Sequence, residues 1–317
     1  MAIDTKVAIV GAGYMAREHV RAFSGLDGVR VVGVFSRTEA RARALAEEFA
    51  IPEVCLSIDD LYARTRAELI VVAVRELEMS TVAKACFAHP WTCLLEKPAG
   101  YDLRDAEGLL AAAQATRSTV YVGLNRRSYG STRSALKFLS TDGGTRLITV
   151  NDQQDMAAAA ISGQPAEVVR NYMFANSIHI IDYLRVFGRG SIVSVSPVVP
   201  WNPLRPGFVI AHIEFASGDI GLYEGVWDGP GPWAAIVTDP QIRLEMRPLE
   251  SLAIQRRGER VRTAIEIDSV DSEFKPGLRI QAMRAVEAVR RGSAVGLPTL
   301  ADSTESMRLC ARIFGLI

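Results

Sequence analysis

The stretch VAIVGAGYMA, residues 7–16, decides the fold expected for the amino-terminal half of the chain. An apolar run suited to a buried strand leads directly into Gly11 and Gly13, and an amphipathic stretch of helical length follows. A strand, a glycine turn and a helix in this order are typical of dinucleotide sites, where the helix amino terminus offers amide donors to a pyrophosphate. The alternative is a glycine-rich connection that binds nothing.

Each residue of this turn has an expected role. Gly11 permits the tight turn, Gly13 lets the backbone approach a ligand, and Ala16 keeps the helix close to the strand. Tyr14 and Met15 lie between these positions and are expected to contact the same ligand.

The rest of the first half alternates short apolar runs with amphipathic stretches, which predicts a parallel sheet covered by helices on both faces. The predicted strands are Val7–Val10, Val29–Phe35, Leu69–Val74, Thr92–Leu95 and Thr119–Val122. The predicted helices are Ala40–Phe49, Ser80–Ala88 and Leu103–Thr116, with Ser57 and Asp102 as expected N-caps. Residues 1–123 are therefore expected to form a doubly wound α/β Rossmann domain.

After about Leu124 strands follow one another through hairpin-like turns, which favours an antiparallel sheet. The predicted strands are Arg146–Asp152, Ile192–Val198, Phe208–Phe215, Ile220–Trp227, Ala234–Thr238, Ile242–Met246 and Leu252–Arg256, and helices are predicted at Ile178–Phe187, Gly277–Arg291 and Ser303–Phe314. Residues 124–317 are thus expected to form an α+β domain on a largely antiparallel open sheet. The last helix, about 301–315, could pack back on the first domain.

Composition narrows the classes of partner and location. The 317 residues include 36 basic and 36 acidic side chains, so no net charge attracts nucleic acid or an anionic membrane. No apolar run approaches the roughly 20 residues that span a bilayer, and the first residues lack a signal-peptide pattern, so a cytoplasmic protein is expected. The four cysteines lie far apart, which favours buried free thiols over a metal site.

The end of the second predicted strand bears on the choice of dinucleotide. An acid normally stands there to bind the adenosine ribose, but this chain has Ser36, Arg37 and Thr38. A guanidinium with two hydroxyls can hold a 2'-phosphate, and no carboxylate is expected nearby to repel it, so NADP is favoured over NAD. Alternatively, Arg37 is a solvated residue at the start of a helix.

A charged pair followed by proline, Glu96-Lys97-Pro98, ends the predicted strand at Thr92–Leu95. With the glycine turn, the segments Val122–Arg127 and His179–Asp182, and the terminal segment Pro298–Ile317, this triplet resembles the Gfo/Idh/MocA oxidoreductase family over nearly the whole chain. The resemblance implies a Rossmann domain joined to an α+β domain whose open sheet mediates oligomer contacts, in a dimer or tetramer. It places Lys97 beside the nicotinamide and a substrate hydroxyl, and it implies a cis peptide bond before Pro98.

Lys97 is also a catalytic candidate on chemical grounds. Loss of hydride from a carbinol carbon requires the hydroxyl proton to leave as well. Lys97 either loses its own proton, which needs a shifted pKa, or stays charged and stabilises an alkoxide, and the second role is favoured. Glu96 is expected to be structural and to lie at the cofactor. The alternative for Lys97 is an ordinary exposed lysine.

His179 is the second catalytic candidate, because an imidazole can pass a proton to or from a substrate oxygen near neutral pH. The family commonly has an Asp four residues before this histidine, where this chain has Ala175. His179 would therefore act alone or with Lys97, with Asp182 orienting the ring and Asn176 near the substrate. A structural His179 remains the alternative. His19, on the first helix, is expected to pack rather than react.

Two further segments flank the expected site. The family's Thr-Pro-Asn segment is replaced after Val74 by Arg75-Glu76-Leu77-Glu78, so the cofactor contacts there are open. Asn125 is expected at the cofactor. Arg126 and Arg127 either contact an anionic substrate or form salt bridges between the domains.

The expected function is NAD(P)-dependent interconversion of an alcohol and a ketone on a sugar, polyol or related small molecule, without a metal because no ligand cluster occurs in the sequence. Two alternatives stay open. Ala175 and the altered segment after Val74 also suit a cofactor-binding sensor that has lost catalysis. An imine or bilin-type reductase would need fewer protein acids.

Overall fold

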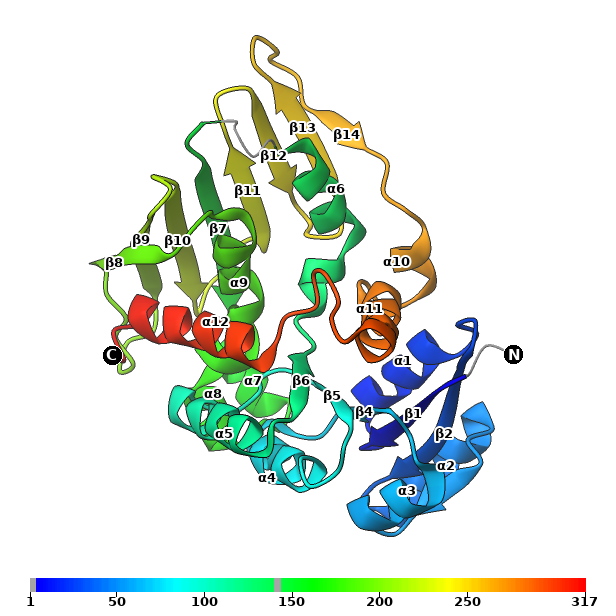
Figure 1. Cartoon of the computed structure of the whole chain (residues 1–317). Coiled ribbons are helices and arrows are strands. Elements are labelled where there is room, and N and C mark those ends of the chain that lie inside the picture. The colour runs from blue at the N-terminus through cyan, green and yellow to red at the C-terminus, as the bar shows by residue number, and fades with distance from the viewer. Residues whose placement is uncertain (1–3, 140–143) are drawn as a thin grey trace. The chain divides into compact units, whose positions relative to one another are not determined.

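A computed structural model describes residues 4–139 and 144–317, which divide into two compact units (Figure 1). The first unit contains the described residues up to Ser128 together with Val270–Thr304. The second unit contains the described residues from Tyr129 to Ser269 together with Glu305–Ile317.

The first unit is built on a six-stranded parallel sheet with the order β3-β2-β1-β4-β5-β6. Its strands are β1 (Thr5–Val10), β2 (Val29–Phe35), β3 (Glu53–Cys55), β4 (Leu69–Val72), β5 (Thr92–Leu95) and β6 (Thr119–Val122). The predicted Rossmann domain is thereby confirmed. In such sheets ligands bind beyond the carboxyl ends of the strands, where the strand order reverses. Here the order reverses between β1 and β4.

Helices of the first unit are α1 (Tyr14–Phe23), α2 (Glu39–Phe49), α3 (Ile58–Thr65), α4 (Glu76–Cys86), α5 (Leu103–Thr116), α10 (Val270–Glu273) and α11 (Leu278–Arg291). The helix α11 was expected within the second domain, since residues 124–317 were assigned there. The structure has it in the first unit because Leu278, Ala282 and Ala285 pack into the core formed by β1, β2, β4 and α1. An amphipathic pattern predicts such a helix but does not name the surface that it covers.

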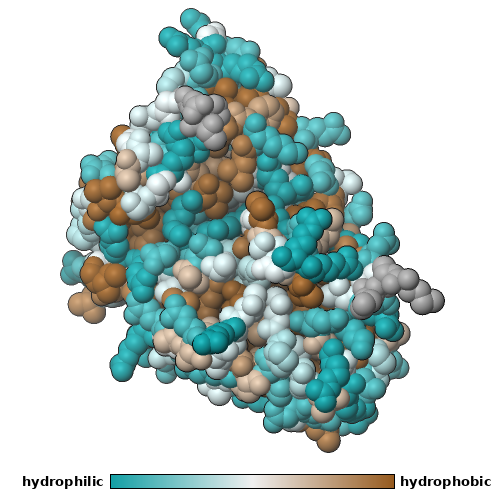
Figure 2. Space-filling model, viewed as in Figure 1, coloured by the Kyte–Doolittle hydropathy of each residue, from teal (hydrophilic) through white to brown (hydrophobic). Residues whose placement is uncertain are grey.

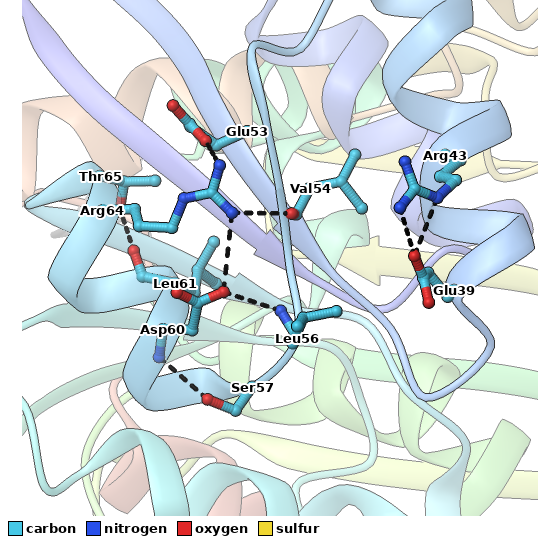
Figure 3. Close-up of polar contacts among 10 residues, drawn as sticks. All are labelled: Glu39, Arg43, Glu53, Val54, Leu56, Ser57, Asp60, Leu61, Arg64 and Thr65. Carbon is cyan, nitrogen blue, oxygen red and sulfur yellow. Dashed lines mark hydrogen bonds and ion pairs between the residues drawn. The ribbon is translucent and has the colours of Figure 1, made fainter.

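The amino terminus of α3 shows how local sequence fixes these elements. Ser57 Oγ accepts a hydrogen bond from the Asp60 backbone N–H over 3.0 Å, and Asp60 accepts one in return from the Leu56 N–H over 2.9 Å (Figure 3). The predicted N-cap at Ser57 is confirmed, as is the one at Asp102, which accepts from the Asp105 N–H. Reciprocal capping satisfies donors that a helix end leaves unpaired.

The helix predicted at Ser80–Ala88 is displaced in the structure. α4 begins at Glu76, with Arg75 as its N-cap residue, and ends at Cys86. The stretch Arg75–Glu78 is therefore the cap and first turn of a helix, where Glu76 and Glu78 are favoured by the positive end of the helix dipole.

The second unit contains an eight-stranded mixed sheet with the order β14-β13-β12-β11-β7-β10-β9-β8. Its strands are β7 (Leu147–Gln154), β8 (Ile192–Val199), β9 (Phe208–Phe215), β10 (Ile220–Trp227), β11 (Ala234–Thr238), β12 (Ile242–Met246), β13 (Leu252–Arg256) and β14 (Thr263–Ile265). All described pairs are antiparallel except β7 with β10. The largely antiparallel sheet is confirmed.

One face of this sheet forms the core of the second unit. The buried positions of β7 alternate with half-buried or exposed ones, and α9 (Ile178–Phe187) packs on β7 and β11. The remaining helices are α6 (Gly130–Phe138), α7 (Met156–Ile161), α8 (Ala166–Arg170) and most of α12 (Leu300–Ile313), of which α6, α7 and α8 were not predicted. A π-helix at Met173–Ser177 runs directly into α9.

The described residues include no helix long and apolar enough to cross a membrane. All four cysteines are buried free thiols, as predicted. Burial raises the pKa of Cys86 to about 12, so this thiol stays protonated and unreactive at neutral pH.

Candidate functional site

The glycine turn lies between β1 and α1, at the carboxyl edge of the parallel sheet. Gly11 has φ +113°, and a β-carbon there would stand 2.1 Å from the Ala73 carbonyl oxygen. Around Gly13, by contrast, an added β-carbon would meet nothing within 4 Å. Gly13 is also the N-cap residue of α1, where no side chain caps the helix. The turn thus combines a tightly packed glycine with open space before a helix amino terminus, which fits a pyrophosphate.

The segment after β2 brings a basic and an acidic side chain together. Arg37 Nη1 lies 3.0 Å from Glu78 Oε2, which comes from the first turn of α4. Arg37 is largely exposed, and the Ser36 Oγ accepts a hydrogen bond from the Thr38 backbone N–H over 3.3 Å. The sequence suggested that no carboxylate stands near Arg37, and that interpretation is wrong, because α4 supplies one. A 2'-phosphate at this place would compete with Glu78 for the guanidinium.

Beyond the end of β5 the chain turns sharply at the charged pair. The Lys97–Pro98 peptide bond is cis, as the family resemblance implied. Glu96 is buried and Lys97 is half-buried. The Glu96 carboxylate Oε2 accepts a hydrogen bond from the Lys97 backbone N–H over 3.3 Å.

His19 and Glu96 form a buried pair. The His19 Nε2 lies 2.6 Å from Glu96 Oε1, and the exposed fractions of the two side chains are 1% and 7%. His19 faces inward from α1, whereas Glu96 stands at the end of β5. Only a packing role was predicted for His19, because no local pattern links two residues that are 77 positions apart.

The ammonium of Lys97 lies among charges of both signs. Burial lowers the pKa of Lys97 from its ordinary value, Glu96 opposes this effect most strongly, and Arg126 adds to it. Weaker contributions come from Glu76, which raises the pKa, and from Lys275, which lowers it. Lys275 was not a candidate in the sequence, and its Nζ lies 5.3 Å from the centre of the Tyr14 ring. The remote segment before α11 therefore belongs to the surroundings of the glycine turn.

The candidates that follow strands β6 and β4 have different environments. Asn125 is buried, and its Nδ2 donates a hydrogen bond to the Pro276 carbonyl oxygen over 3.0 Å. Arg126 and Arg127 are half-buried in the 3₁₀-helix η1 (Asn125–Ser128). Val74 is half-buried just after β4.

In the second unit the second catalytic candidate lies directly after the π-helix. His179 and Asp182 are buried on α9, and Asp182 Oδ1 accepts a hydrogen bond from Ser306 Oγ over 2.6 Å. Ala175 and Asn176 lie within the π-helix itself. Single π-turns are rare and occur frequently at functional sites.

A chain of hydrogen bonds connects the π-helix to the sheet. Asn176 Nδ2 donates to Gln154 Oε1 over 2.9 Å, and Gln154 Nε2 donates to Asp152 Oδ1 over 2.6 Å. The Tyr223 hydroxyl donates to Asp152 Oδ2 over 2.7 Å. Burial and the adjacent Asp152 raise the pKa of Tyr223 well above its ordinary value, so the phenol remains a donor. Asp152, Gln154 and Tyr223 were not candidates in the sequence, where alternation along strands marks only burial.

The structure brings the candidates together in two groups. Gly11, Gly13, Glu96, Lys97 and Asn125 belong to the first unit, while His179, Asn176 and Asp182 belong to the second. Among the described residues no cluster of histidine, cysteine and carboxylate side chains is arranged to hold a metal ion.

Comparison with known proteins shows what the chain is similar to. Residues 5–124 match the oxidoreductase family with an NAD-binding Rossmann fold. Inositol 2-dehydrogenase 1 of Saccharopolyspora erythraea is 34% identical over 141 residues, which is 42% of this chain and 42% of that protein. The chain thus aligns with less than half of the length of that relative.

Solved structures agree over nearly the full length. A dehydrogenase from Chromobacterium violaceum superposes with a TM-score of 0.84 at 18% identity, covering 100% of this chain and 95% of that one. Levoglucosan dehydrogenase, solved with NADH and levoglucosan, has a TM-score of 0.80 at 15% identity over 98% and 96% of the two chains. At these identities the structures show the fold alone.

The sequence match covers the glycine turn and the Glu96-Lys97-Pro98 triplet, and the fold around both is the one that the family resemblance implied. Residues 5–124 are therefore similar to the NAD-binding Rossmann domain of the Gfo/Idh/MocA oxidoreductases.

Proposed function

We propose that this protein is an NAD(P)-dependent oxidoreductase that interconverts an alcohol and a ketone on a sugar, polyol or related small molecule. The observation that supports this most is a half-buried lysine, Lys97, at the same carboxyl edge of the parallel sheet as the glycine turn. The relative and the structural neighbour that are named for their substrates act on inositol and levoglucosan, both of which carry several hydroxyl groups.

Lys97 binds and polarises the substrate oxygen in this proposal. When bound, the nicotinamide supplies the hydride chemistry. The Glu96 carboxylate opposes the effect of burial on Lys97, which favours the charged ammonium over the neutral amine. A cation at this position stabilises the alkoxide that forms as the hydroxyl proton leaves.

His179 handles that proton. Its buried place on α9, just after the π-helix, supports the assignment, because the other buried residues of α9 are apolar apart from Asp182 and Tyr183. Asn176 is the proposed substrate contact beside it, with its Nδ2 held by Gln154 and its carbonyl oxygen left to accept from a hydroxyl. Asp182 and the arginines Arg126 and Arg127 remain secondary candidates.

The cofactor is NADP in preference to NAD. Arg37 with Ser36 and Thr38 offers donors suited to a 2'-phosphate. Glu78 weakens this preference, because the phosphate must displace a carboxylate that lies 3.0 Å from the guanidinium. Val74 and Asn125 complete the proposed cofactor contacts.

Self-association through the second unit is a further part of the proposal. Apolar side chains gather over the β8 edge of the sheet, where Val193 and Val198 are both 63% exposed (Figure 2). The face of the sheet opposite α9 adds exposed Leu147, Phe208 and Ile220. A second copy of the chain would cover this surface, and light scattering on the purified protein measures whether a dimer or tetramer forms.

The function is tested by incubating the protein with NADP, NADPH, NAD or NADH and a panel of polyols, keto-sugars and imines, while nicotinamide absorbance is followed. Turnover of a polyol or keto-sugar supports the proposal. Turnover of imines alone would favour a reductase of another class. Tight cofactor binding with no turnover across the panel would favour the sensor, which Ala175 at the family's Asp position also suits.

A further inference from the structure

We propose that His19 is a positioning residue, which holds the carboxylate of Glu96 as the counter-charge that keeps Lys97 protonated. The inference rests on the role proposed for Lys97, and it assigns to His19 and Glu96 a function beyond packing. It follows from the contacts of one buried carboxylate with two partners, the imidazole of His19 and the backbone N–H of Lys97.

The hydrogen-bond pattern places the shared proton. His19 Nδ1 is buried and has no hydrogen-bond partner, whereas Nε2 lies 2.6 Å from Glu96 Oε1. An imidazolium would bury a charged N–H donor at Nδ1 without an acceptor, which costs more than leaving a neutral nitrogen lone pair unpaired. His19 is therefore neutral, with its proton on Nε2, and it donates to an ionised Glu96.

Both oxygens of Glu96 are used in this arrangement. Oε1 accepts from His19, and Oε2 accepts from the Lys97 N–H over 3.3 Å. A β-carbon at Gly123 would stand 3.3 Å from Oε1 and 3.4 Å from Gln281 Nε2, so the carboxylate is closely walled on that side. A buried carboxylate needs such donors to remain charged.

The charge of Glu96 matters because it is the strongest of the contributions that oppose the effect of burial on the pKa of Lys97. Burial and the cations Arg126 and Lys275 favour the neutral amine, while Glu96 and the weaker contribution of Glu76 favour the ammonium. Glu96 is the larger of the two acidic contributions. Loss of its charge, or of the donor that fixes it, would release the Lys97 proton at lower pH.

This charge state can be measured without a substrate, so the test stands apart from the proposed function. The sequence contains only five lysines, Lys6, Lys84, Lys97, Lys137 and Lys275. Trace acetic anhydride acetylates only neutral amines, and mass spectrometry of the labelled peptides gives a rate against pH for each lysine. The exposed Lys84 on α4 serves as the internal reference.

Four variants separate the contributions. Glu96→Gln removes the charge and keeps the shape, and it is expected to lower the labelling midpoint of Lys97 by about one pH unit or more. His19→Gln keeps a donor near Nε2, and the midpoint is expected to stay within a few tenths of a unit. His19→Met has nearly the same length without a donor, and its midpoint is expected to fall. His89→Gln alters a half-buried histidine away from Lys97, which pairs with Asp59 over 2.8 Å, and it serves as the matched control.

Circular dichroism and NADPH fluorescence titration verify that each variant is folded. The proposal would be overturned if Glu96→Gln folds and its Lys97 is labelled with the same pH midpoint as in the wild type. This test remains available even if His19→Met does not fold. If the labelling midpoint of Lys97 is the same in His19→Gln and His19→Met, then His19 does not act as the positioning residue. The absence of turnover with every substrate would overturn the proposed function but leave this result standing.

Discussion

Gly11 and Ala73 approach so closely that a β-carbon at residue 11 would stand 2.1 Å from the Ala73 carbonyl oxygen. The φ of Gly11, +113°, adds a second obstacle to any larger residue. We therefore expect Gly11→Ala to lower the free energy of unfolding by about 3 kcal/mol or more, through strain between β1 and β4. Urea denaturation measures the loss, and an unchanged midpoint would show that the strands can separate at no cost.

Gly13→Ala supplies the matched comparison, because an added β-carbon there meets no protein atom within 4 Å. We expect this variant to be as stable as the wild type but to bind NADPH at least about tenfold more weakly, since the methyl group occupies space intended for the pyrophosphate. Fluorescence titration gives the dissociation constant. Undiminished binding would place the pyrophosphate elsewhere.

Lys97→Met tests the proposed polarising group. The change removes the ammonium and keeps an unbranched side chain, so we expect kcat on the substrate found in the panel to fall by at least about a hundredfold. The dissociation constant for NADPH is expected to stay within about threefold, because the glycine turn is unaltered. Lys84→Met, on the exposed side of α4, is the control. Turnover that survives in Lys97→Met would remove this residue from the mechanism.

The contrast between these residues shows which parts of the site are predictable from sequence. The glycine turn and the Glu96-Lys97-Pro98 triplet follow from local patterns, because a strand, a turn and a helix are adjacent in the chain. The pair formed by His19 and Glu96 joins residues 77 positions apart, and only the packing of α1 against the sheet brings them together. A hydrophobicity pattern predicts that such residues are buried, but it does not predict which residues they contact.

The surfaces on which helices pack could not be predicted from the sequence either. The spacing of apolar residues predicted α11 almost to its ends, yet the same spacing suits packing on either unit. The short helices α7 and α8 were missed because runs such as MAAAAI have no polar face to mark a helical period. The pairing of Glu78 with Arg37 was not predicted, because α4 was predicted to begin after Glu78.

The pair Arg37 and Glu78 predicts a change of cofactor selectivity. Glu78→Gln removes the carboxylate that competes with a 2'-phosphate, so we expect NADP to bind a few-fold more tightly while NAD affinity changes little. Arg37→Gln is expected to weaken NADP binding by about tenfold or more. Isothermal titration calorimetry with both dinucleotides gives the ratio of the dissociation constants for NADP and NAD. If Arg37→Gln leaves that ratio unchanged, Arg37 is only a solvated residue at the start of α2.

Asp219 predicts the response of the second unit to acid. The side chain lies buried in the turn between β9 and β10 and accepts hydrogen bonds from Arg189 Nη2 over 2.6 Å and from the Arg146 N–H over 2.9 Å. Burial acts to raise the pKa of Asp219, but these donors outweigh it and lower the pKa to about 2. The folded state therefore favours the ionised carboxylate more than the unfolded chain does.

Because the pKa of Asp219 is lower in the folded state than in the unfolded chain, its contribution to stability decreases as the pH falls. Above about pH 4 the carboxylate is ionised in both states and contributes about 2 kcal/mol to stability, and this contribution is lost as the pH falls towards about 2. Asp219→Asn is expected to be less stable at neutral pH and to show a shallower loss of stability between these two pH values. Urea midpoints at a series of pH values measure both effects, with the exposed Asp228→Asn as the control. An acid response of Asp219→Asn as steep as that of the wild type would assign the transition to other carboxylates.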